Sequence, residues 1–186
     1  MNKAEILRYL RTRSTIDDER LLNLIDNLMN EVDKTVEPKS IYRIFDCIVT
    51  EDTLIIENFE FKSKRLAENL KGCSKVAILA ATVGTEGDRL LRTYSAEGAR
   101  LAIMQAVLAS KIEEICDAVQ DHIEKENKVK TRQRYSPGYF DLDISEQKKL
   151  FSLLEITKRC GITLTDTCQM IPTKSVTAFT GIDYED

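Results

Sequence analysis

The sequence offers few of the residues that build metal sites. It has a single histidine, His122, in a polar helical stretch where a solvated side chain is the usual case. Its cysteines form no C-x-x-C pair, and their spacings suit neither a zinc site nor a thioredoxin-like motif. We therefore expect no metal site and no disulfide. The five thiols expected to be reduced and partly buried are Cys47, Cys73, Cys116, Cys160 and Cys168.

An excess of basic residues and a long apolar run are also missing. The chain carries 27 Lys and Arg against 31 Asp and Glu, and its net charge of -4 disfavours a phosphate backbone as the main ligand. The opening residues, MNKAEILRYLRTRS, lack the apolar core of a signal peptide, and no run is long enough to span a bilayer. These absences predict a cytoplasmic protein with no nucleic-acid and no membrane partner.

Glycine is scarce, with seven residues, and none of them forms a nucleotide-binding loop. The stretch GTEGD, residues 84–88, lacks the lysine and the glycine pattern of a phosphate loop, so we interpret it as a turn from a strand into a helix. No G-x-G-x-G-like loop follows an early strand. A general small-molecule methyltransferase with a doubly wound fold is therefore not indicated.

The residues that are present predict a mixture of helices and strands. Thr15 and Asp18 form a capping pair before apolar residues at helical spacing, which continue until Pro38 closes the helix. Residues 41–49 and the run TLIIE, residues 53–57, are rich in β-branched and aromatic side chains and predict a hairpin. Residues 61–72 then show helical periodicity and end at Gly72.

The second half of the chain continues this alternation. KVAILAATVG, residues 75–84, is a continuous apolar run that predicts a strand buried on both faces at the centre of the sheet. Residues 86–125 predict two helices divided near Ser95 and Gly98.

The C-terminal part predicts one more helix and a pair of strands. Asp143 and Glu146 form a capping box for a helix that ends at Gly161. The tail alternates like a strand pair around residues 172–174. The pattern as a whole predicts an α+β fold, with a mostly antiparallel sheet flanked by helices, in one domain spanning residues 1–186.

One segment, RQRYSPGYFDLD, carries the chemistry that stands out. Pro137 fixes the backbone, and Gly138 permits a tight turn or a close approach of a ligand to the main chain. Arg134 offers a planar fork of donors for a carboxylate or phosphate, and Tyr139 offers a ring face and a hydroxyl. The simpler interpretation is an ordinary Pro-Gly turn with Arg134 as a surface charge.

Residues 134–181 resemble the activation domain of cobalamin-dependent methionine synthase, because three motifs recur in order. The first is R-x-x-x-G-Y, at Arg134, Gly138 and Tyr139. The second is G-x-x-L-T, at Gly161, Leu164 and Thr165. The third is M-x-P-x-x-S-V, at Met170, Pro172, Ser175 and Val176. Residues 73–186 form the matched region, whereas the helices and hairpin of residues 1–72 match the family poorly.

The resemblance implies a site for S-adenosylmethionine. It implies that Arg134 holds the methionyl carboxylate, that the backbone from Ser136 to Gly138 lies near the ligand, and that the side chain of Tyr139 lies against it. The family also uses a glutamate on the long helix before this loop, and alignment by helical pattern puts Glu114 there, with Glu113 as the one-residue alternative. The family's tyrosine pair falls beyond the expected terminal hairpin, where Tyr184 is the nearby aromatic residue.

The resemblance also implies a role. It indicates an activator that supplies S-adenosylmethionine for the reductive methylation of cob(II)alamin carried by a methionine synthase or a related corrinoid protein, acting in trans. The implied partners are a cobalamin-binding domain and a flavodoxin- or ferredoxin-like reductant. No residue of the chain is expected to act as a catalytic acid or base. The alternative is a docking or regulatory module for a corrinoid protein that does not bind S-adenosylmethionine.

Overall fold

The computed structural model describes residues 1–11 and 18–184 and is built around one four-stranded sheet. The strand order is β1-β5-β9-β6, and every neighbouring pair is antiparallel. The strands are β1 (Lys39–Asp46), β5 (Lys75–Thr82), β9 (Ser175–Tyr184) and β6 (Val129–Thr131). The predicted fold class, α+β with a mostly antiparallel sheet, is confirmed.

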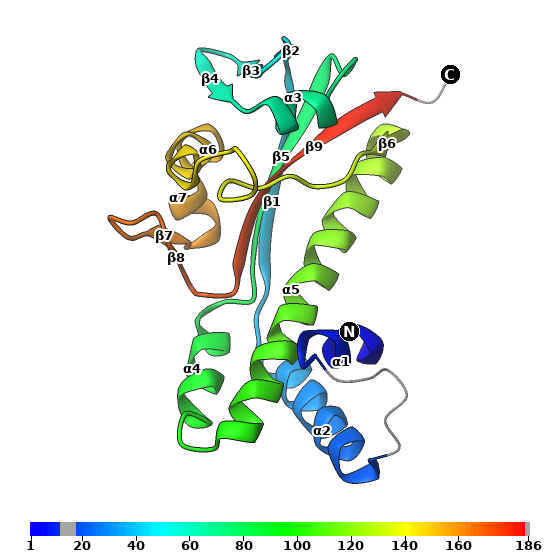
Figure 1. Cartoon of the computed structure of the whole chain (residues 1–186), viewed down its shortest axis with the longest axis vertical. Coiled ribbons are helices and arrows are strands. Elements are labelled where there is room, and N and C mark those ends of the chain that lie inside the picture. The colour runs from blue at the N-terminus through cyan, green and yellow to red at the C-terminus, as the bar shows by residue number, and fades with distance from the viewer. Residues whose placement is uncertain (12–17, 185–186) are drawn as a thin grey trace.

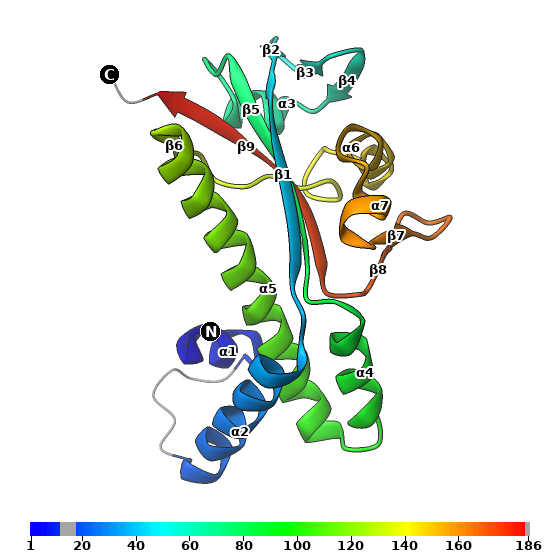
Figure 2. The same cartoon turned by 180° about the vertical axis from the view of Figure 1, so that it is seen from behind.

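Helices cover both faces of this sheet (Figures 1 and 2). The long helix α5 (Gly98–Asn127) runs along one face, where α1 (Lys3–Tyr9), α2 (Glu19–Thr35) and α4 (Thr85–Thr93) pack against it. The opposite face carries α6 (Gln147–Leu154) and α7 (Ile156–Cys160). Beside them lie α3 (Lys64–Asn69) and a small sheet of β2 (Ile48–Val49), β3 (Thr53–Ile56) and β4 (Phe59–Lys62).

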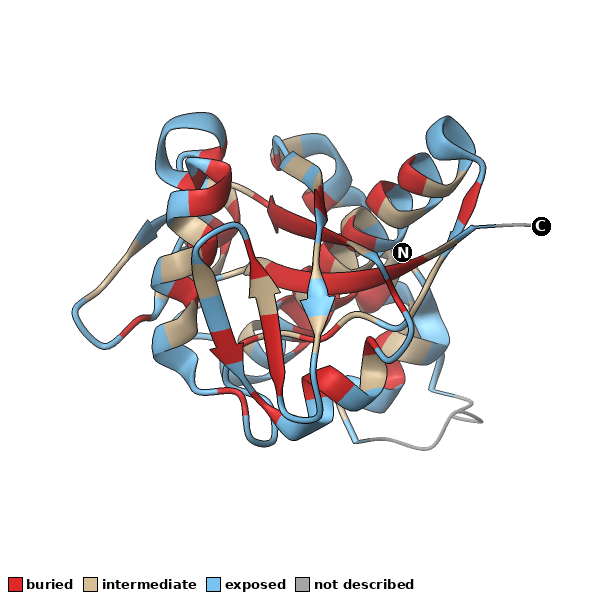
Figure 3. Cartoon of the chain, turned by 90° about the horizontal axis from the view of Figure 1, so that it is seen from above, coloured by how far each residue is buried: buried red, intermediate tan, exposed pale blue. Residues whose placement is uncertain are grey.

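The central strand β5 separates two apolar cores, because successive side chains of a strand point to opposite faces. Ala77, Leu79 and Ala81 belong to the core beneath α5. Val76, Ile78 and Ala80 belong to the core beneath α3, α6 and α7. Every residue of β5 except Lys75 is buried, as the continuous apolar run predicted. Figure 3 shows the buried strands between helices whose outer faces are exposed.

The N-terminal region differs from the prediction in how its strands pair. Residues 41–49 do not form one arm of a hairpin, because the run divides at Cys47: β1 pairs with β5, and only β2 pairs with β3. The N–H of Cys47 donates to the carbonyl of Ser74 (2.9 Å), which continues the β1–β5 pairing past the end of β1. The N-terminal region thus completes the main sheet.

Helix boundaries show smaller differences. Asp18 caps α2 by accepting hydrogen bonds from the N–H groups of Arg20 and Leu21, whereas Thr15, its predicted partner, lies outside the described residues. The predicted helix at 61–72 begins later, because Phe61 lies in β4 and Ser63 caps α3. The predicted division of residues 86–125 is confirmed, since α4 ends at Thr93 and α5 begins at Gly98.

The C-terminal part differs from the prediction in two ways. The single helix expected to end at Gly161 is divided into α6 and α7 at Glu155, whose φ is +50°, and the last strands pair differently. Asp143 caps a short 3₁₀ turn, η1 (Ile144–Glu146), which leads into α6. The strands flanking residues 172–174 do not pair with each other: β8 (Met170–Ile171) pairs with β7 (Thr163–Leu164), and β9 enters the main sheet. The reason is burial, since the middle of β9 is enclosed on both faces, which a two-stranded terminal hairpin could not provide.

The structure also bears on two further expectations, the lack of a membrane-spanning segment and the state of the cysteines. Among the described residues, no helix has both the length and the apolar character needed to cross a membrane. All five cysteines are free, and all but Cys47 are buried.

Candidate functional site

A cleft of about 1030 Å³ lies where the segment of residues 133–140 passes between α3 and α5. Ile144, Gln147 and residues of β8 and of the first part of β9 complete its lining. The volume is at the upper end of the range for small-molecule sites. Arg134, Ser136 and Tyr139 all line this cleft, so the structure brings three of the predicted site residues together.

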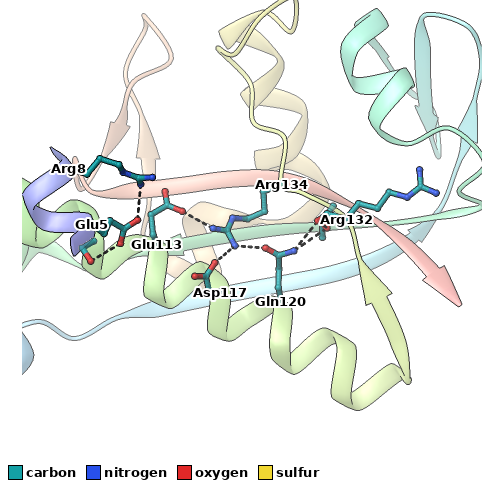
Figure 4. A network of polar contacts seen from close by, with 9 residues as sticks. Glu5, Arg8, Glu113, Asp117, Gln120, Arg132 and Arg134 are labelled. Atoms are coloured by element: carbon teal, nitrogen blue, oxygen red, sulfur yellow. Dashed lines mark hydrogen bonds and ion pairs between the residues drawn. The ribbon is translucent and has the colours of Figure 1, made fainter. Parts of the chain in front are cut away.

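A bulge beside β9 sets the direction of the arginine side chains in this segment. Thr131 is opposite Ile182 in the β6–β9 pair, and Tyr135 forms an isolated bridge with Phe179. From Thr131 to Tyr135 the segment advances four residues, whereas β9 advances three between Ile182 and Phe179. The segment therefore carries one extra residue, as in a β-bulge. Bulges redirect side chains, and Figure 4 shows Arg134 turned towards α5 while Arg132 extends away from it.

The loop after the bulge has a fixed shape that requires glycine. Gly138 adopts a φ of +91°, and a Cβ there would lie 2.9 Å from Cδ1 of Ile144. Its N–H donates to the carbonyl of Leu142 (2.8 Å), which closes the loop. Gly138 does not line the cleft itself. Its role in this structure is to give the segment from Ser136 to Tyr139 its curvature.

Asp141 ties this loop to the opposite wall of the cleft. Its carboxylate accepts from the hydroxyl of Ser63 (2.6 Å) and from the N–H groups of Lys64 (2.7 Å) and Arg65 (3.2 Å). It thus caps the N-terminus of α3 from a distant part of the chain. The hydrogen bond from Ser63 is the main reason that the pKa of Asp141 lies below its usual value. One carboxylate therefore holds together the loop and the helix that border the cleft.

Arg134 is held by three side chains of α5 (Figure 4). Its Nη2 donates to Glu113 (2.7 Å), and its Nη1 donates to Asp117 (2.7 Å) and to Gln120. Burial opposes its charge, but the hydrogen bond to Asp117 and the other nearby acceptors outweigh burial and raise the pKa of the guanidinium. Arg134 is therefore a permanent cation next to two carboxylates.

The guanidinium still has unused donors. All three hydrogen bonds come from Nη1 and Nη2, and none of the described residues accepts from Nε of Arg134. Two N–H groups therefore remain, one on Nε and one on Nη2, and each can donate to a carboxylate or phosphate. Arg134 can therefore bind an anionic group without giving up its contacts with α5.

Exposed aromatic rings border the cleft. Tyr139 is 64% exposed and Phe140 is 83% exposed. The ring of Phe140 stacks on Tyr135 with centroids 6.1 Å apart, and the guanidinium of Arg65 lies 5.8 Å from the Phe140 centroid. These rings offer flat apolar surface for a ligand or a partner.

The two candidate glutamates of α5 point to different places. Glu113 lines the cleft, whereas Glu114 lies on a separate hollow of about 680 Å³ beside α1. Consecutive helical residues are rotated by about 100°, so only one of them can face Arg134. Glu114 pairs with the amino group of Met1 (3.1 Å) and with Lys111 (3.2 Å). Burial would raise the pKa of Glu114, but these two partners outweigh it and lower that pKa.

Sequence reasoning missed Asp117 and Gln120. Together with Glu113 they stand four and three residues apart, which places them on one face of a helix. The apolar residues between these positions predict only the face of the helix that packs on the core. The signal that was available is this second, polar stripe along the helix that precedes the R-x-x-x-G-Y loop.

Comparisons with known proteins agree with this architecture. A family model described as "Vitamin B12 dependent methionine synthase, activation domain" matches residues 66–184. A solved structure, "Crystal Structure of the MetH Reactivation Domain bound to AdoHcy", superposes with a TM-score of 0.72 at 16% identity, covering 96% of this chain and 70% of that chain. At this identity the likeness shows the fold. A sequence comparison with curated proteins gives no match. The family match spans most of the chain, and the chain belongs to the family of activation domains of vitamin B12-dependent methionine synthase.

Proposed function

We propose that the cleft binds S-adenosylmethionine. The observation that carries this proposal is that Arg134 lines the cleft, at the R-x-x-x-G-Y motif, with no acceptor for its Nε among the described residues. Family membership and the likeness to a domain crystallised with AdoHcy support it. S-adenosylmethionine has one carboxylate that can accept from the unused donors and two cationic groups, an ammonium and a sulfonium.

The charges around Arg134 suit such a ligand. With Glu113 and Asp117 both paired to Arg134, this group of three charged side chains has one negative charge in excess. The methionyl carboxylate accepts from the unused donors of Arg134, and the two acids favour the cationic part of the ligand. Ser136, Pro137 and the ring of Tyr139 lie along the ligand, and Gly138 gives their loop its curvature. We assign the family's helical glutamate to Glu113 rather than Glu114, because Glu113 is the one that lines the cleft.

The activity that follows is activation in trans. An external reductant, flavodoxin- or ferredoxin-like, supplies one electron to cob(II)alamin on a methionine synthase or related corrinoid protein. The bound sulfonium then loses its methyl group to the reduced cobalt, and S-adenosylhomocysteine remains. The part of this chain is to hold the methyl donor in one orientation, which is the contribution a protein makes when the chemistry belongs to the cofactor.

The first experiment is isothermal titration with S-adenosylmethionine, S-adenosylhomocysteine and ATP. We expect saturable binding of the first two and none of ATP. Arg134→Ala should weaken S-adenosylmethionine by about 1.5 to 3 kcal/mol, because a hydrogen bond between two charged groups is lost. A matched control is Arg8→Ala, which removes an exposed arginine of α1. Unchanged affinity in Arg134→Ala would contradict the assignment.

One observation favours a second candidate, a docking module that does not use S-adenosylmethionine. Arg134 is already paired with two carboxylates, which is also how a purely structural arginine is held. Reconstitution distinguishes the two functions. With oxidised methionine synthase, a reductant and methyl-labelled S-adenosylmethionine, an activator transfers label to the partner's cobalamin. A docking module binds the partner and transfers none.

A further inference from the structure

Gln120, on α5, makes hydrogen bonds through both the oxygen and the nitrogen of its side-chain amide (Figure 4). Its Oε1 accepts from Nη1 of Arg134. Its Nε2 donates to the hydroxyl of Thr131 (2.8 Å) and to the carbonyl of Arg132 (3.1 Å), with a longer contact to the hydroxyl of Thr180 (3.4 Å). The partners of Nε2 belong to β6, to β9 and to the segment that carries Arg134.

These partners fix which way the amide points. Rotating the amide by a half turn would set Nε2 against the donor Nη1 of Arg134 and Oε1 against the carbonyl of Arg132. Two donors or two acceptors facing each other lose both hydrogen bonds. The carbonyl of Arg132 also accepts from the hydroxyl of Thr180 (2.6 Å), which holds it in place on the β9 side. The oxygen of Gln120 therefore has one stable direction, towards Arg134.

We propose that Gln120 is a positioning residue that sets the rotation of the Arg134 guanidinium and so keeps its unused Nε N–H available to the ligand's carboxylate. Asp117 is 69% exposed, so its bond to Arg134 competes with water. Gln120 is part-buried and is held by hydrogen bonds to the sheet, so it supplies the more rigid contact with Nη1. This inference rests on the proposed function, in which the unused donors of Arg134 receive the ligand's carboxylate.

The amide is better suited to this role than a carboxylate. A glutamate at position 120 would have no donor for the carbonyl of Arg132. It would also add a third negative charge around Arg134, beside Glu113 and Asp117, where the ligand's own carboxylate has to bind. The neutral amide satisfies the arginine and the main chain at the same time.

The test is a mutant cycle measured by titration calorimetry. Gln120→Met keeps the length of the side chain and removes its hydrogen bonds, and Gln120→Asn is the second variant should the first fail to fold. We expect Gln120→Met to weaken S-adenosylmethionine about tenfold or more in the wild-type chain. In an Arg134→Ala chain, the same substitution should change the affinity less than about twofold. Circular dichroism and thermal unfolding of each variant establish that the fold is retained.

A second ligand separates positioning from a general structural role. 5′-Methylthioadenosine lacks the amino acid part, so its affinity should be insensitive to Gln120→Met. Equal weakening of both ligands, or the same loss with Arg134 absent, would overturn the positioning role while leaving the proposed function intact. Failure of the wild-type chain to bind S-adenosylmethionine would overturn the proposed function and this inference together.

Discussion

Arg132 and Arg134 stand two residues apart in the same segment, yet their guanidinium groups are engaged differently. Arg132 places Nε and Nη2 on Asp183 (2.8 and 2.7 Å) and Nη1 on the carbonyls of Asn69 (2.8 Å) and Lys71 (2.9 Å). Its planar fork is filled by the protein itself. Arg134 donates to its neighbours only from Nη1 and Nη2, and none of the described residues accepts from its Nε.

Residue type and exposure do not show this difference. Both side chains are mostly buried, at 28% and 18% exposure, and both have a raised pKa. What separates them is that Nε has an acceptor in Arg132 and none among the described residues in Arg134. The bulge between Thr131 and Tyr135 is the structural cause, because it sends the two side chains to different parts of the molecule.

The largest expected effect tests the structural side of this comparison. Arg132→Ala removes the contacts that join the end of β9 to the C-terminal end of α3, and leaves the two carbonyls without their donor. We expect the free energy of unfolding to fall by about 3 kcal/mol, since four hydrogen bonds contribute about 1 kcal/mol each and Asp183 is partly exposed. Urea denaturation measures this loss.

Arg134→Ala is the matched variant for that measurement. It should lower ligand affinity while changing the unfolding free energy by less than Arg132→Ala does. If the two variants exchanged these effects, with Arg134→Ala the less stable chain, the assignment of Arg134 to binding and Arg132 to structure would be wrong.

The sequence predicted most of the fold because local patterns and burial agreed there. The apolar run of β5 and the division between α4 and α5 are clear in the sequence and appear in the structure. The predicted N-terminal hairpin was partly wrong and the predicted C-terminal strand pair was wrong, and the reason is the same for both. Strand patterns show that a segment is extended but do not show which strand it pairs with. Both β1 and β9 pair with β5, which lies more than 25 residues away from each of them along the chain. Pairing at that distance leaves no local signal in the sequence.

The candidate site was predictable to the extent that it lies in one loop. Arg134, Ser136 and Tyr139 follow each other closely and arrive in the cleft together. Asp117 and Gln120 were missed because their contact with Arg134 depends on which side of α5 the loop crosses. Glu113 and Glu114 could not be separated for the same reason, since both are acidic and adjacent.

A smaller effect is expected where Asp141 joins the loop to α3. Asp141→Asn should lower the unfolding free energy by about 1 kcal/mol near pH 7, the usual size of an N-cap contribution. The pKa of Asp141 in the folded chain is lowered, mainly by the hydroxyl of Ser63 and also by the N–H groups of Arg65 and Lys64. A lowered folded pKa means that the stabilisation is present above the unfolded value, about 3.9, and is lost as the pH falls through the folded pKa.

The measurement for Asp141 is chemical denaturation across the acid range. The difference between wild type and Asp141→Asn should be constant at neutral pH and should shrink below about pH 4. Asp143→Asn is the control, because Asp143 caps only the short turn η1 and lies outside the connection to α3. A difference that persisted unchanged in acid would show that the charge of Asp141 is not the source of the stabilisation.

The smallest expected effect decides between the two adjacent glutamates of α5. Glu114→Gln should leave the affinity for S-adenosylmethionine within about twofold of wild type, because Glu114 faces Met1 and Lys111 rather than the cleft. Glu113→Gln should weaken the cationic S-adenosylmethionine more than the neutral-sulfur S-adenosylhomocysteine, because it removes a carboxylate that lines the cleft. The two variants change the net charge equally and differ only in the direction of the side chain. A loss of affinity in Glu114→Gln with none in Glu113→Gln would therefore mean that the ligand lies towards α1, on the other side of Asp117, and that Arg134 does not bind its carboxylate.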